Sequence, residues 1–335
     1  MLILAMPGNE ALAQDLAREC GGQAARVLVR HFPDGESLVR IDAAPDGRDV
    51  VFACTLDHPH DKTLPLVFAA DAARELGARR VGLVAPYLAY MRQDARFQPG
   101  EAISSRSFAR LLSSSFDFLL TVDPHLHRWH SLDQIYTLRT QVVPAAPAIA
   151  AWLADQVPAP LLVGPDEESA QWVSEVARLA HAPWTVMRKT RQGDREVRVV
   201  APPREPQWSG RTPVLVDDII STGHTLVAAA QALQAAELGA ALCVGVHALH
   251  DGDAQARMLH AGIARVASCD SVHHPSNAIA LAPLLAPALN KLLAEAVVPA
   301  PAANASDAAT AAIAATAMPA TAPASSSSRT FPSSS

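Results

Sequence analysis

The sequence has few cysteines, no cluster of basic residues and no long apolar run, and each absence narrows what the protein can be. Its four cysteines lie far apart, at positions 20, 54, 243 and 269, so neither a disulfide framework nor a zinc knuckle is indicated. The net charge is −6 and Lys and Arg do not gather in one stretch, which argues against nucleic acid as the main partner.

No apolar run is both long enough and sufficiently free of proline to span a bilayer. Residues 1–6 are apolar but short and have no basic region before them, so we interpret them as a first strand rather than a signal peptide. We therefore expect a cytoplasmic protein without a membrane partner. The P-loop string Gly-x-x-x-x-Gly-Lys-Ser/Thr is also missing, which disfavours a kinase of that class.

Short apolar runs alternate with Ala/Leu-rich amphipathic stretches up to residue 296, a pattern that predicts βαβ units and mostly parallel sheets. The expected strands are residues 2–6, 50–53, 80–85, 118–122, 161–163, 185–187, 196–200, 214–216, 243–248 and 266–268. The expected helices are residues 69–76, 105–113, 149–155, 169–180, 226–238 and 278–293.

With 335 residues, half of them hydrophobic, the chain can form two domains of ordinary size. The proline-rich stretch 144–160 is the natural boundary, which predicts domains at 1–143 and 144–275 followed by a helical segment at 276–297. The similar lengths of the two parts suggest a duplicated domain. Residues 298–335 are almost all Ala, Pro, Ser and Thr without periodicity, so we expect a disordered tail.

Residues 214–225 carry the strongest functional signal: an apolar run delivers Asp217 and Asp218, and a turn of small residues leads into a helical stretch. In open α/β sheets ligands bind at the carboxyl ends of strands, and a helix N-terminus offers backbone N–H groups to an anion. We therefore expect a phosphosugar site in which the carboxylates take hydroxyls. The phosphate would lie on the turn formed by Ser221, Thr222, Gly223, His224 and Thr225. For the Asp-Asp pair alone, an ordinary capped strand–turn–helix junction is the alternative.

This string resembles the 5-phosphoribosyl 1-diphosphate (PRPP) binding motif, which phosphoribosyltransferases and ribose-phosphate diphosphokinases share. A second segment, with Pro86-Tyr87, Tyr90, Arg92-Gln93-Asp94 and later Glu101-Ala102-Ile103-Ser104, resembles the diphosphokinases specifically. Arginine suits a polyphosphate because its guanidinium binds oxyanions in a bidentate manner. The resemblance implies that Arg92, Gln93 and Asp94 bind ATP, whereas Arg-Gln-Asp by itself would be a solvated loop.

Residues 31–36 read His-Phe-Pro-Asp-Gly-Glu and resemble the family's Phe-x-Asp-Gly-Glu loop, which reaches into the ATP site of a neighbouring subunit. The resemblance implies that Phe32 stacks on adenine, and that Asp34, Gly35 and Glu36 complete the ATP site at the amino edge and ribose. It also implies a homo-oligomer. For Phe32 alone, a buried turn aromatic is the alternative.

Three further segments resemble motifs of the same family. Asp123-Pro124-His125 resembles its Asp-x-His, which implies that His125 holds a metal, and Pro165-Asp166 resembles its Pro-Asp, which gives Asp166 a metal and ribose role. Magnesium is the metal implied, an ion that prefers oxygen and keeps several waters. Lys189-Thr190-Arg191 resembles the Lys-x-Arg of the catalytic flexible loop, although by itself it would be a solvated edge strand.

The chain departs from the family pattern at three places. Ala95 stands where many members have a basic residue, although Arg96 follows at once. Glu168-Ser169 replaces a Gly-Gly pair, and His224 stands where a second glycine is common. These departures leave an alternative, a regulatory paralogue that binds other subunits but has no turnover. The residues that match the family's metal site and flexible loop favour an active enzyme instead.

The resemblance therefore implies an α/β fold of two phosphoribosyltransferase-like (type I) domains, with the helical segment 276–297 packed on the first. It implies transfer of the diphosphoryl group of ATP to the C1 hydroxyl of ribose 5-phosphate, giving PRPP and AMP. A phosphoribosyltransferase that consumes PRPP would use the acidic turn equally well. It would, however, leave the Phe-x-Asp-Gly-Glu and Arg-Gln-Asp loops without a role.

Overall fold

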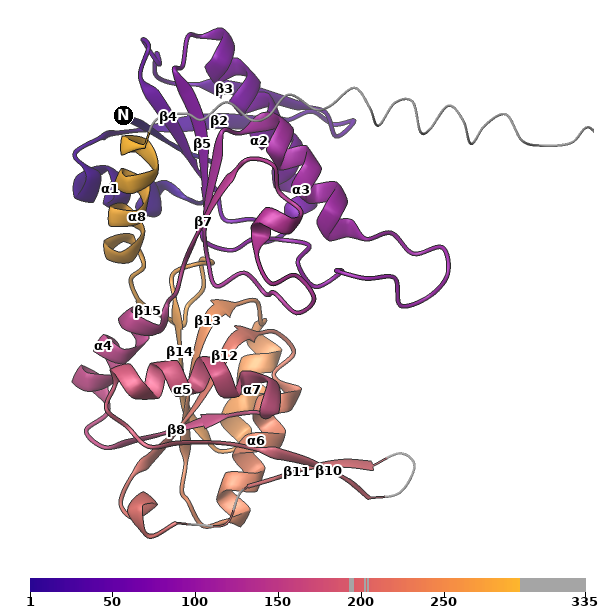
Figure 1. Ribbon diagram of the computed structural model, residues 1–335, viewed down its shortest axis with the longest axis vertical. Coiled ribbons are helices and arrows are strands. Elements are labelled where there is room, and N and C mark those ends of the chain that lie inside the picture. The colour runs from indigo at the N-terminus through magenta and orange to yellow at the C-terminus, as the bar shows by residue number, and fades with distance from the viewer. Residues whose placement is uncertain (193–195, 202, 204, 296–335) are drawn as a thin grey trace, which may run out of the picture. The chain divides into compact units, whose positions relative to one another are not determined.

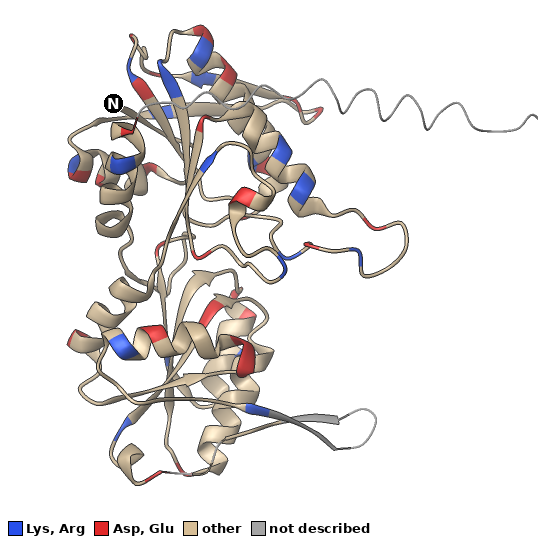
Figure 2. Cartoon of the chain, viewed as in Figure 1, with Lys and Arg blue, Asp and Glu red and all other residues tan. Residues whose placement is uncertain are grey.

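The computed structural model of the chain describes residues 1–192, 196–201, 203 and 205–295, and for residues 189–198 it describes no side chains. The expected tail at 298–335 lies outside the described residues. Acidic and basic residues are interspersed over most of the described helices and strands, whereas the helix Ser104–Ser115 carries two arginines and no acidic residue (Figure 2). None of the described helices is long and apolar enough to cross a membrane.

Seven strands of the described chain form the first sheet, in the order β3-β2-β1-β4-β5-β6-β7. They are β1 (Leu2–Ala5), β2 (Gln23–His31), β3 (Ser37–Ile41), β4 (Asp49–Ala53), β5 (Arg80–Ala85), β6 (Phe118–Val122) and β7 (Arg139–Val143). β3 is antiparallel to β2, and the other neighbours are parallel. β1, β4, β5 and β6 are buried along their whole length, as parallel strands covered on both faces should be.

Helices cover both faces of this first sheet (Figure 1). α1 (Glu10–Cys20) and α8 (Ala282–Ala294) pack with Ile3 and Leu120 in one core, and α2 (Pro59–Glu75) and α3 (Ser104–Ser115) pack with Leu2 and Leu4 in another. The C-terminal helix of the chain thus completes the core of the first sheet. The helix predicted at 278–293 begins later than expected, because Asn277–Ile279 instead extends the second sheet as strand β15.

The second sheet has the order β15-β14-β13-β12-β8-β9, and every neighbouring pair in it is parallel. Its other strands are β8 (Pro160–Gly164), β9 (Trp184–Val186), β12 (Thr212–Ile220), β13 (Ala241–Ala248) and β14 (Ile263–Cys269). α4 (Ala146–Gln156) and α5 (Ala170–Leu179) lie on one face, and α6 (His224–Ala235) and α7 (Gly252–His260) on the other. Short 3-10 turns occur at Leu132–Gln134, Glu167–Ser169 and Pro206–Trp208.

The two sheets repeat one strand order. β1 lies between β2 and β4 as β8 lies between β9 and β12, and β5, β6 and β7 then correspond to β13, β14 and β15. β2 pairs with β1 through residues 23–26 and with β3 through residues 27–31. In the second sheet β9 pairs with β8, while β10 (Arg188–Gln192) pairs with the antiparallel β11 (Glu196–Val200). The repeated order supports the duplication, and it makes the β2–β3 hairpin the counterpart of the β10–β11 hairpin.

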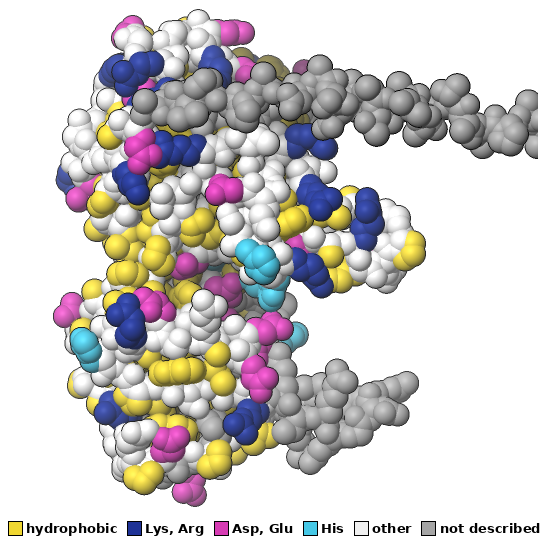
Figure 3. All heavy atoms as spheres, in the orientation of Figure 1, with side chains coloured by type: hydrophobic (Ala, Val, Ile, Leu, Met, Phe, Trp, Pro, Cys, Tyr) yellow, Lys and Arg dark blue, Asp and Glu magenta, His cyan; other side chains and the backbone are white. Residues whose placement is uncertain are grey.

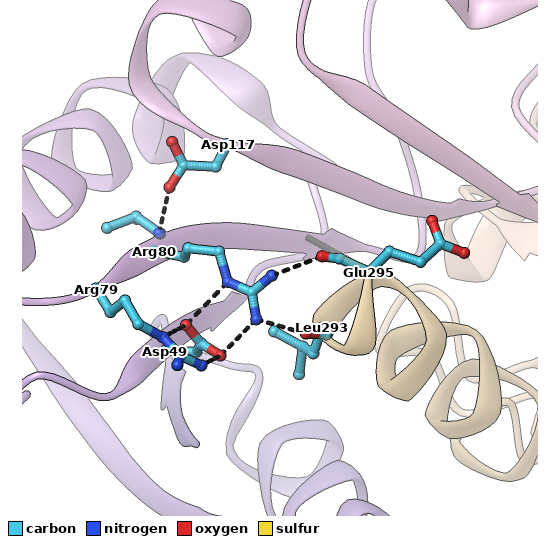
Figure 4. Close-up of polar contacts among 7 residues, drawn as sticks. Asp49, Arg79, Arg80, Asp117, Leu293 and Glu295 are labelled. Atoms are coloured by element: carbon cyan, nitrogen blue, oxygen red, sulfur yellow. Dashed lines mark hydrogen bonds and ion pairs between the residues drawn. The ribbon is translucent and has the colours of Figure 1, made fainter. Parts of the chain in front are cut away.

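A buried arginine fastens α8 to the first sheet (Figure 4). The guanidinium of Arg80 on β5 donates to both carboxylate oxygens of Asp49, at 2.9 and 2.6 Å. It also donates to the carbonyl oxygens of Leu293 and Glu295 at the end of α8, at 2.6 and 3.2 Å. Burial alone would raise the pKa of Asp49, but the hydrogen bonds and charges of Arg80 and Arg79 hold it well below its usual range. One side chain therefore pairs a buried carboxylate and caps the helix.

We expect Arg80→Ala to lower the free energy of unfolding by about 3 kcal/mol, because it leaves Asp49 and the end of α8 partly unpaired in a buried place. The matched control is Arg79→Ala, since Arg79 also donates to Asp49 but its side chain is 65% exposed. For this variant we expect a loss below about 1 kcal/mol. Urea unfolding measures both, and equal losses would contradict the role given to Arg80.

Candidate functional site

The acidic pair lies within a strand rather than at its end. β12 continues through Asp217 and Asp218 to Ile220, whereas its pairing with β8 stops at Leu215. β8 ends at Gly164, so the edge of β12 that faces β8 is unpaired beside the carboxylates. The turn that follows leads into α6, which begins at His224, two residues before the predicted start.

Glycine is required at one position of the turn between β12 and α6, which is predicted to hold the phosphate. Gly223 caps α6 with φ at 73°, a left-handed conformation that side-chain-bearing residues rarely adopt. A Cβ atom there would also lie 3.1 Å from the Met258 side chain. His224 is the first residue of the helix, so this departure from the family pattern leaves the glycine turn in place. The backbone N–H groups of the first turn of α6 are directed at the loop, as an anion site requires.

The two carboxylates have opposite electrostatic behaviour. Burial, followed by the negative charges of Asp218 and Asp166, raises the pKa of Asp217 well above its usual range. Burial would also raise the pKa of Asp218, but the hydrogen bond with His125 lowers it. The ionised form is therefore favoured more strongly at Asp218 than at Asp217.

The partner of Asp218 comes from the other sheet. His125, two residues after Asp123 beyond the end of β6, places its Nδ1 2.6 Å from Oδ2 of Asp218. Asp123 has φ at 34°, and its carboxylate accepts a hydrogen bond from the N–H of Ala145 at 2.8 Å. Burial raises the pKa of Asp123 to about 6. Histidine and acidic side chains gather around the middle of the face drawn in Figure 3. The predicted metal residue and the predicted sugar residue are thus in direct contact.

Asp166, the second predicted metal residue, caps the 3-10 turn after β8. Its carboxylate accepts from the N–H of Ser169 at 3.3 Å, and the Ser169 hydroxyl donates to its carbonyl oxygen at 2.6 Å. Ser169 Oγ also fills the space beside Gly164, where an added Cβ would lie 2.2 Å away. The serine that departs from the family pattern therefore shapes this turn. The negative charge of Asp166 acts on Asp217, which places the two carboxylates near each other.

The three residues predicted to bind ATP in the loop after β5 have different surroundings. Arg92 is exposed, and its positive charge acts on the hydroxyl of Tyr87. Gln93 donates to the carbonyl oxygen of Ala95 at 3.2 Å. Asp94 is buried, and its two oxygens accept from the backbone and the guanidinium of Arg128, at 3.1 and 2.8 Å. Arg92 and Gln93 can therefore meet a ligand, whereas Asp94 is placed to hold the loop.

The predicted adenine loop is the tip of the β2–β3 hairpin. The N–H of Phe32 donates to the carbonyl oxygen of Glu36 at 2.7 Å, and the carboxylate of Asp34 accepts from the N–H of Glu36 at 3.1 Å. Gly35 has φ at 92°, which closes the turn. The Phe32 ring is 38% exposed beneath the guanidinium of Arg30, so it is not the buried turn aromatic given as the alternative.

The predicted catalytic cations lie on the counterpart hairpin. Lys189 and Arg191 belong to β10, where Lys189 pairs with Val199 and Arg191 with Val197 of β11. Their side chains lie outside the described part of the chain. Residues 193–195 of the hairpin-like stretch predicted from Gln192 to Arg195 lie outside the described residues, and the strands on either side of them pair antiparallel.

Whether the site suits a magnesium ion can be judged from its donors. Within the described residues, no three or more His, Cys, Asp or Glu side chains form a group that could hold a metal by themselves. Magnesium is commonly bound by one or two carboxylates together with substrate phosphates and water. Burial and then the negative charges of Asp218 and Asp166 raise the pKa of Asp217, and a cation beside these carboxylates would offset that repulsion. The residues therefore fit an ion that is bound together with a polyphosphate, not a preformed cage.

Sequence reasoning missed His247 on β13, which is fully buried beside the site. Its Nε2 lies 3.3 Å from the carbonyl oxygen of Asp123, and its ring meets that of Tyr87 edge to face at 5.0 Å. The signal was weak, because a single histidine at the end of an apolar strand is more often a core residue. Only the position of that strand end, next to β12 in the sheet, could have indicated a role.

Comparison with known proteins agrees with this geometry. A family model described as the N-terminal domain of ribose phosphate pyrophosphokinase matches residues 1–115, and one described as a phosphoribosyl transferase domain matches residues 138–283. The crystal structure of phosphoribosylpyrophosphate synthetase from Mycobacterium smegmatis has a TM-score of 0.74 at 23% identity, over 87% of this chain and 98% of that one. The fold therefore defines a protein of two phosphoribosyltransferase-type domains.

Curated relatives narrow the class. The ribose-phosphate pyrophosphokinase of Methanopyrus kandleri is 36% identical over 295 residues, which cover 87% of this chain and 99% of the relative. That of Halobacterium salinarum (strain R1) is 33% identical over 291 residues, or 86% and 100% of the two chains. The chain belongs to the ribose-phosphate pyrophosphokinase family, also called diphosphokinases or PRPP synthetases.

The opposite pKa shifts of Asp217 and Asp218 can be tested by measuring the stability of the protein. An aspartate whose folded pKa is raised destabilises the fold at pH values above its unfolded pKa near 4, so Asp217→Asn should remove that cost. We expect its melting temperature to rise by about 2–4 °C at pH 7.5, with the gain shrinking toward pH 4. Asp218→Asn should instead lower it, because the carboxylate that is hydrogen-bonded to His125 is lost. Thermal unfolding at several pH values measures both, and equal losses would refute the assignment.

Proposed function

We propose that this protein transfers the β,γ-diphosphoryl group of ATP to the C1 hydroxyl of ribose 5-phosphate, giving PRPP and AMP. The observation that carries the proposal is the contact between His125 and Asp218, which joins the loops expected to bind ATP to the sugar site. The family of the chain supports the same reaction. A phosphoribosyltransferase is less well supported, since it would leave the exposed Phe32 and Arg92 loops unused.

In this reaction the C1 hydroxyl oxygen attacks the β-phosphorus, the bond from that phosphorus to the oxygen bridging the α-phosphorus breaks, and AMP leaves with the bridging oxygen. The hydroxyl proton is released. Asp217 and Asp218 would orient the ribose hydroxyls, and the turn from Ser221 to Thr225 would hold the 5-phosphate by backbone N–H groups. Phosphoryl transfer of this kind depends mainly on in-line positioning and charge stabilisation, so a strong general base is not required.

Arg92 and Gln93 would bind the ATP phosphates, with Asp94 holding their loop. Phe32, Asp34, Gly35 and Glu36 of a neighbouring subunit would complete the adenine pocket. Lys189 and Arg191 would close over the transferring group and offset its growing negative charge. Magnesium, held by His125 and Asp166 with the substrate phosphates, would supply charge neutralisation on the diphosphoryl oxygens.

The surface of the first sheet supports the homo-oligomer that this arrangement needs. Leu64 and Phe68, one turn apart on α2, are 59% and 47% exposed, and Leu28 and Leu38 on the other face of the β2–β3 hairpin are 41% and 37% exposed. Exposed large apolar side chains such as the pair on α2 are typical of a subunit contact. We also propose a cytoplasmic location, which suits the unpaired cysteines of the described chain.

The direct test is formation of AMP from ATP, ribose 5-phosphate and Mg²⁺. We expect Lys189→Ala to lower kcat by about 100-fold or more while the Kd for ribose 5-phosphate, measured by calorimetry, stays within about threefold. Arg188→Ala, which removes the neighbouring cation on the same strand, should retain most of the activity. ADP in place of AMP, or no ribose 5-phosphate dependence, would refute the proposed reaction. An equal loss for both variants would remove Lys189 from it.

Phe68→Glu should disrupt the proposed subunit contact, because a buried charge at an apolar interface is costly. We expect light scattering to show a smaller particle and the KM for ATP to rise. Leu259→Glu, a change at a 44% exposed leucine of α7, is the matched control and should leave the mass unchanged. A wild-type monomer, or an unchanged mass for Phe68→Glu, would contradict the contact.

A further inference from the structure

A strained turn carries His125 toward the sugar site. Asp123 has φ at 34°, outside the regions that residues with side chains usually occupy, and His125 follows two residues later. Such a conformation costs about 1–3 kcal/mol and persists only where its surroundings hold it. The carboxylate of Asp123 accepts a hydrogen bond from the N–H of Ala145, the residue just before α4. Its carbonyl oxygen, however, is turned toward the second sheet.

The group that meets this carbonyl oxygen is His247. Nε2 of His247 lies 3.3 Å from it, and Nδ1 lies 2.9 Å from Oγ of Ser271. A carbonyl oxygen can only accept, so the hydrogen-bond network assigns the imidazole hydrogen to Nε2. Nδ1 then accepts from the Ser271 hydroxyl, whose hydrogen can alternatively point to the carbonyl oxygen of Val246 at 2.7 Å. His247 is 1% exposed, so no solvent replaces these partners.

The imidazole is held on its other sides as well. The Tyr87 ring packs edge to face against it at 5.0 Å. The carbonyl oxygen of Ser271 accepts a hydrogen bond from the hydroxyl of Thr55 at 2.5 Å. This is a second hydrogen bond between the two parts of the chain, and it does not involve the imidazole. His247 also pairs in register with Ile219, the residue after Asp218 on β12. The backbone of His247 therefore pairs with the strand that carries Asp218, and its side chain contacts the Asp123 turn that positions His125.

We infer that His247 is a positioning residue for the reaction: its Nε2–H holds the strained Asp123 turn, and so sets where His125 meets Asp218. This inference rests on the proposed function, because its effect is on the alignment of two substrates that bind to different parts of the chain. In-line transfer tolerates little error, and a displacement of about 1 Å can cost about 100-fold in rate. His247 itself need not touch either substrate.

Two polar variants separate this role from general packing. The amide of His247→Gln can still donate to the Asp123 carbonyl oxygen, whereas the shorter side chain of His247→Asn can meet only Ser271. We expect the glutamine variant to keep kcat within about threefold of wild type and the asparagine variant to lose about tenfold or more. For both, calorimetry should show ribose 5-phosphate binding at wild-type stoichiometry with Kd within about threefold, because the phosphate turn lies wholly on the second sheet.

Thr55→Val is the matched control, since it removes the other hydrogen bond between the parts at a similarly buried place without touching the Asp123 turn. Its kcat should stay within about threefold of wild type. Equal kcat for the asparagine and glutamine variants, or a Thr55→Val loss as large as that of asparagine, would overturn the inference. A lowered binding stoichiometry in the asparagine variant would do so too, since it indicates misfolding. These outcomes require an active wild type, so an inactive wild type identifies failure of the proposed function instead.

Discussion

The hydrogen bond between His125 and Asp218 is the interaction on which the site depends. It joins a loop of the first sheet to a strand of the second, through two residues that are 93 positions apart in the sequence. This hydrogen bond lowers the pKa of Asp218 against the effect of burial, whereas burial and neighbouring negative charges raise the pKa of the adjacent Asp217. One imidazole thus helps to give two neighbouring aspartates opposite pKa shifts. In the proposed reaction, this difference would suit a cation beside one carboxylate and a sugar hydroxyl beside the other.

This arrangement carries a cost that the rest of the fold offsets. Asp123 has a positive φ, and Asp217 is a buried carboxylate beside other negative charges, and both features are unfavourable for folding. Around them the core is continuous: one apolar cluster runs from Ile3 and Leu16 through Ile149 to Leu285. Arg80 fixes the end of α8 against the first sheet. The strained groups are therefore concentrated where the two sheets meet, within a rigid frame.

The sequence allowed much of the fold to be predicted, because the strands of a parallel sheet are buried on both faces and read as uninterrupted apolar runs. β5 and β6 were predicted with their observed bounds for this reason. The β2 and β3 strands were not predicted, because many of their residues are exposed and the apolar run is broken. α1 was also missed, since it buries only a narrow stripe that includes Leu16.

For the site, motifs indicated which residues gather but not what each one does. The spacing of the motif could not reveal that Asp94 is paired with Arg128, 34 residues away, because that contact depends on tertiary packing. Nor could it reveal that Ser169 shapes the turn of Asp166, or that His247 reaches Asp123 from the neighbouring sheet. Motifs record positions along the chain, whereas these roles arise from contacts across it.

A double-mutant cycle on His125 and Asp218 measures the central contact most directly. The quantity to compare is kcat/KM for AMP formation in His125→Ala, Asp218→Ala and the double variant. If the two side chains act as one unit, the double variant should lose less than the sum of the single losses, with a coupling free energy of about 1–3 kcal/mol. Strictly additive losses would show that the two residues work independently and would contradict the account.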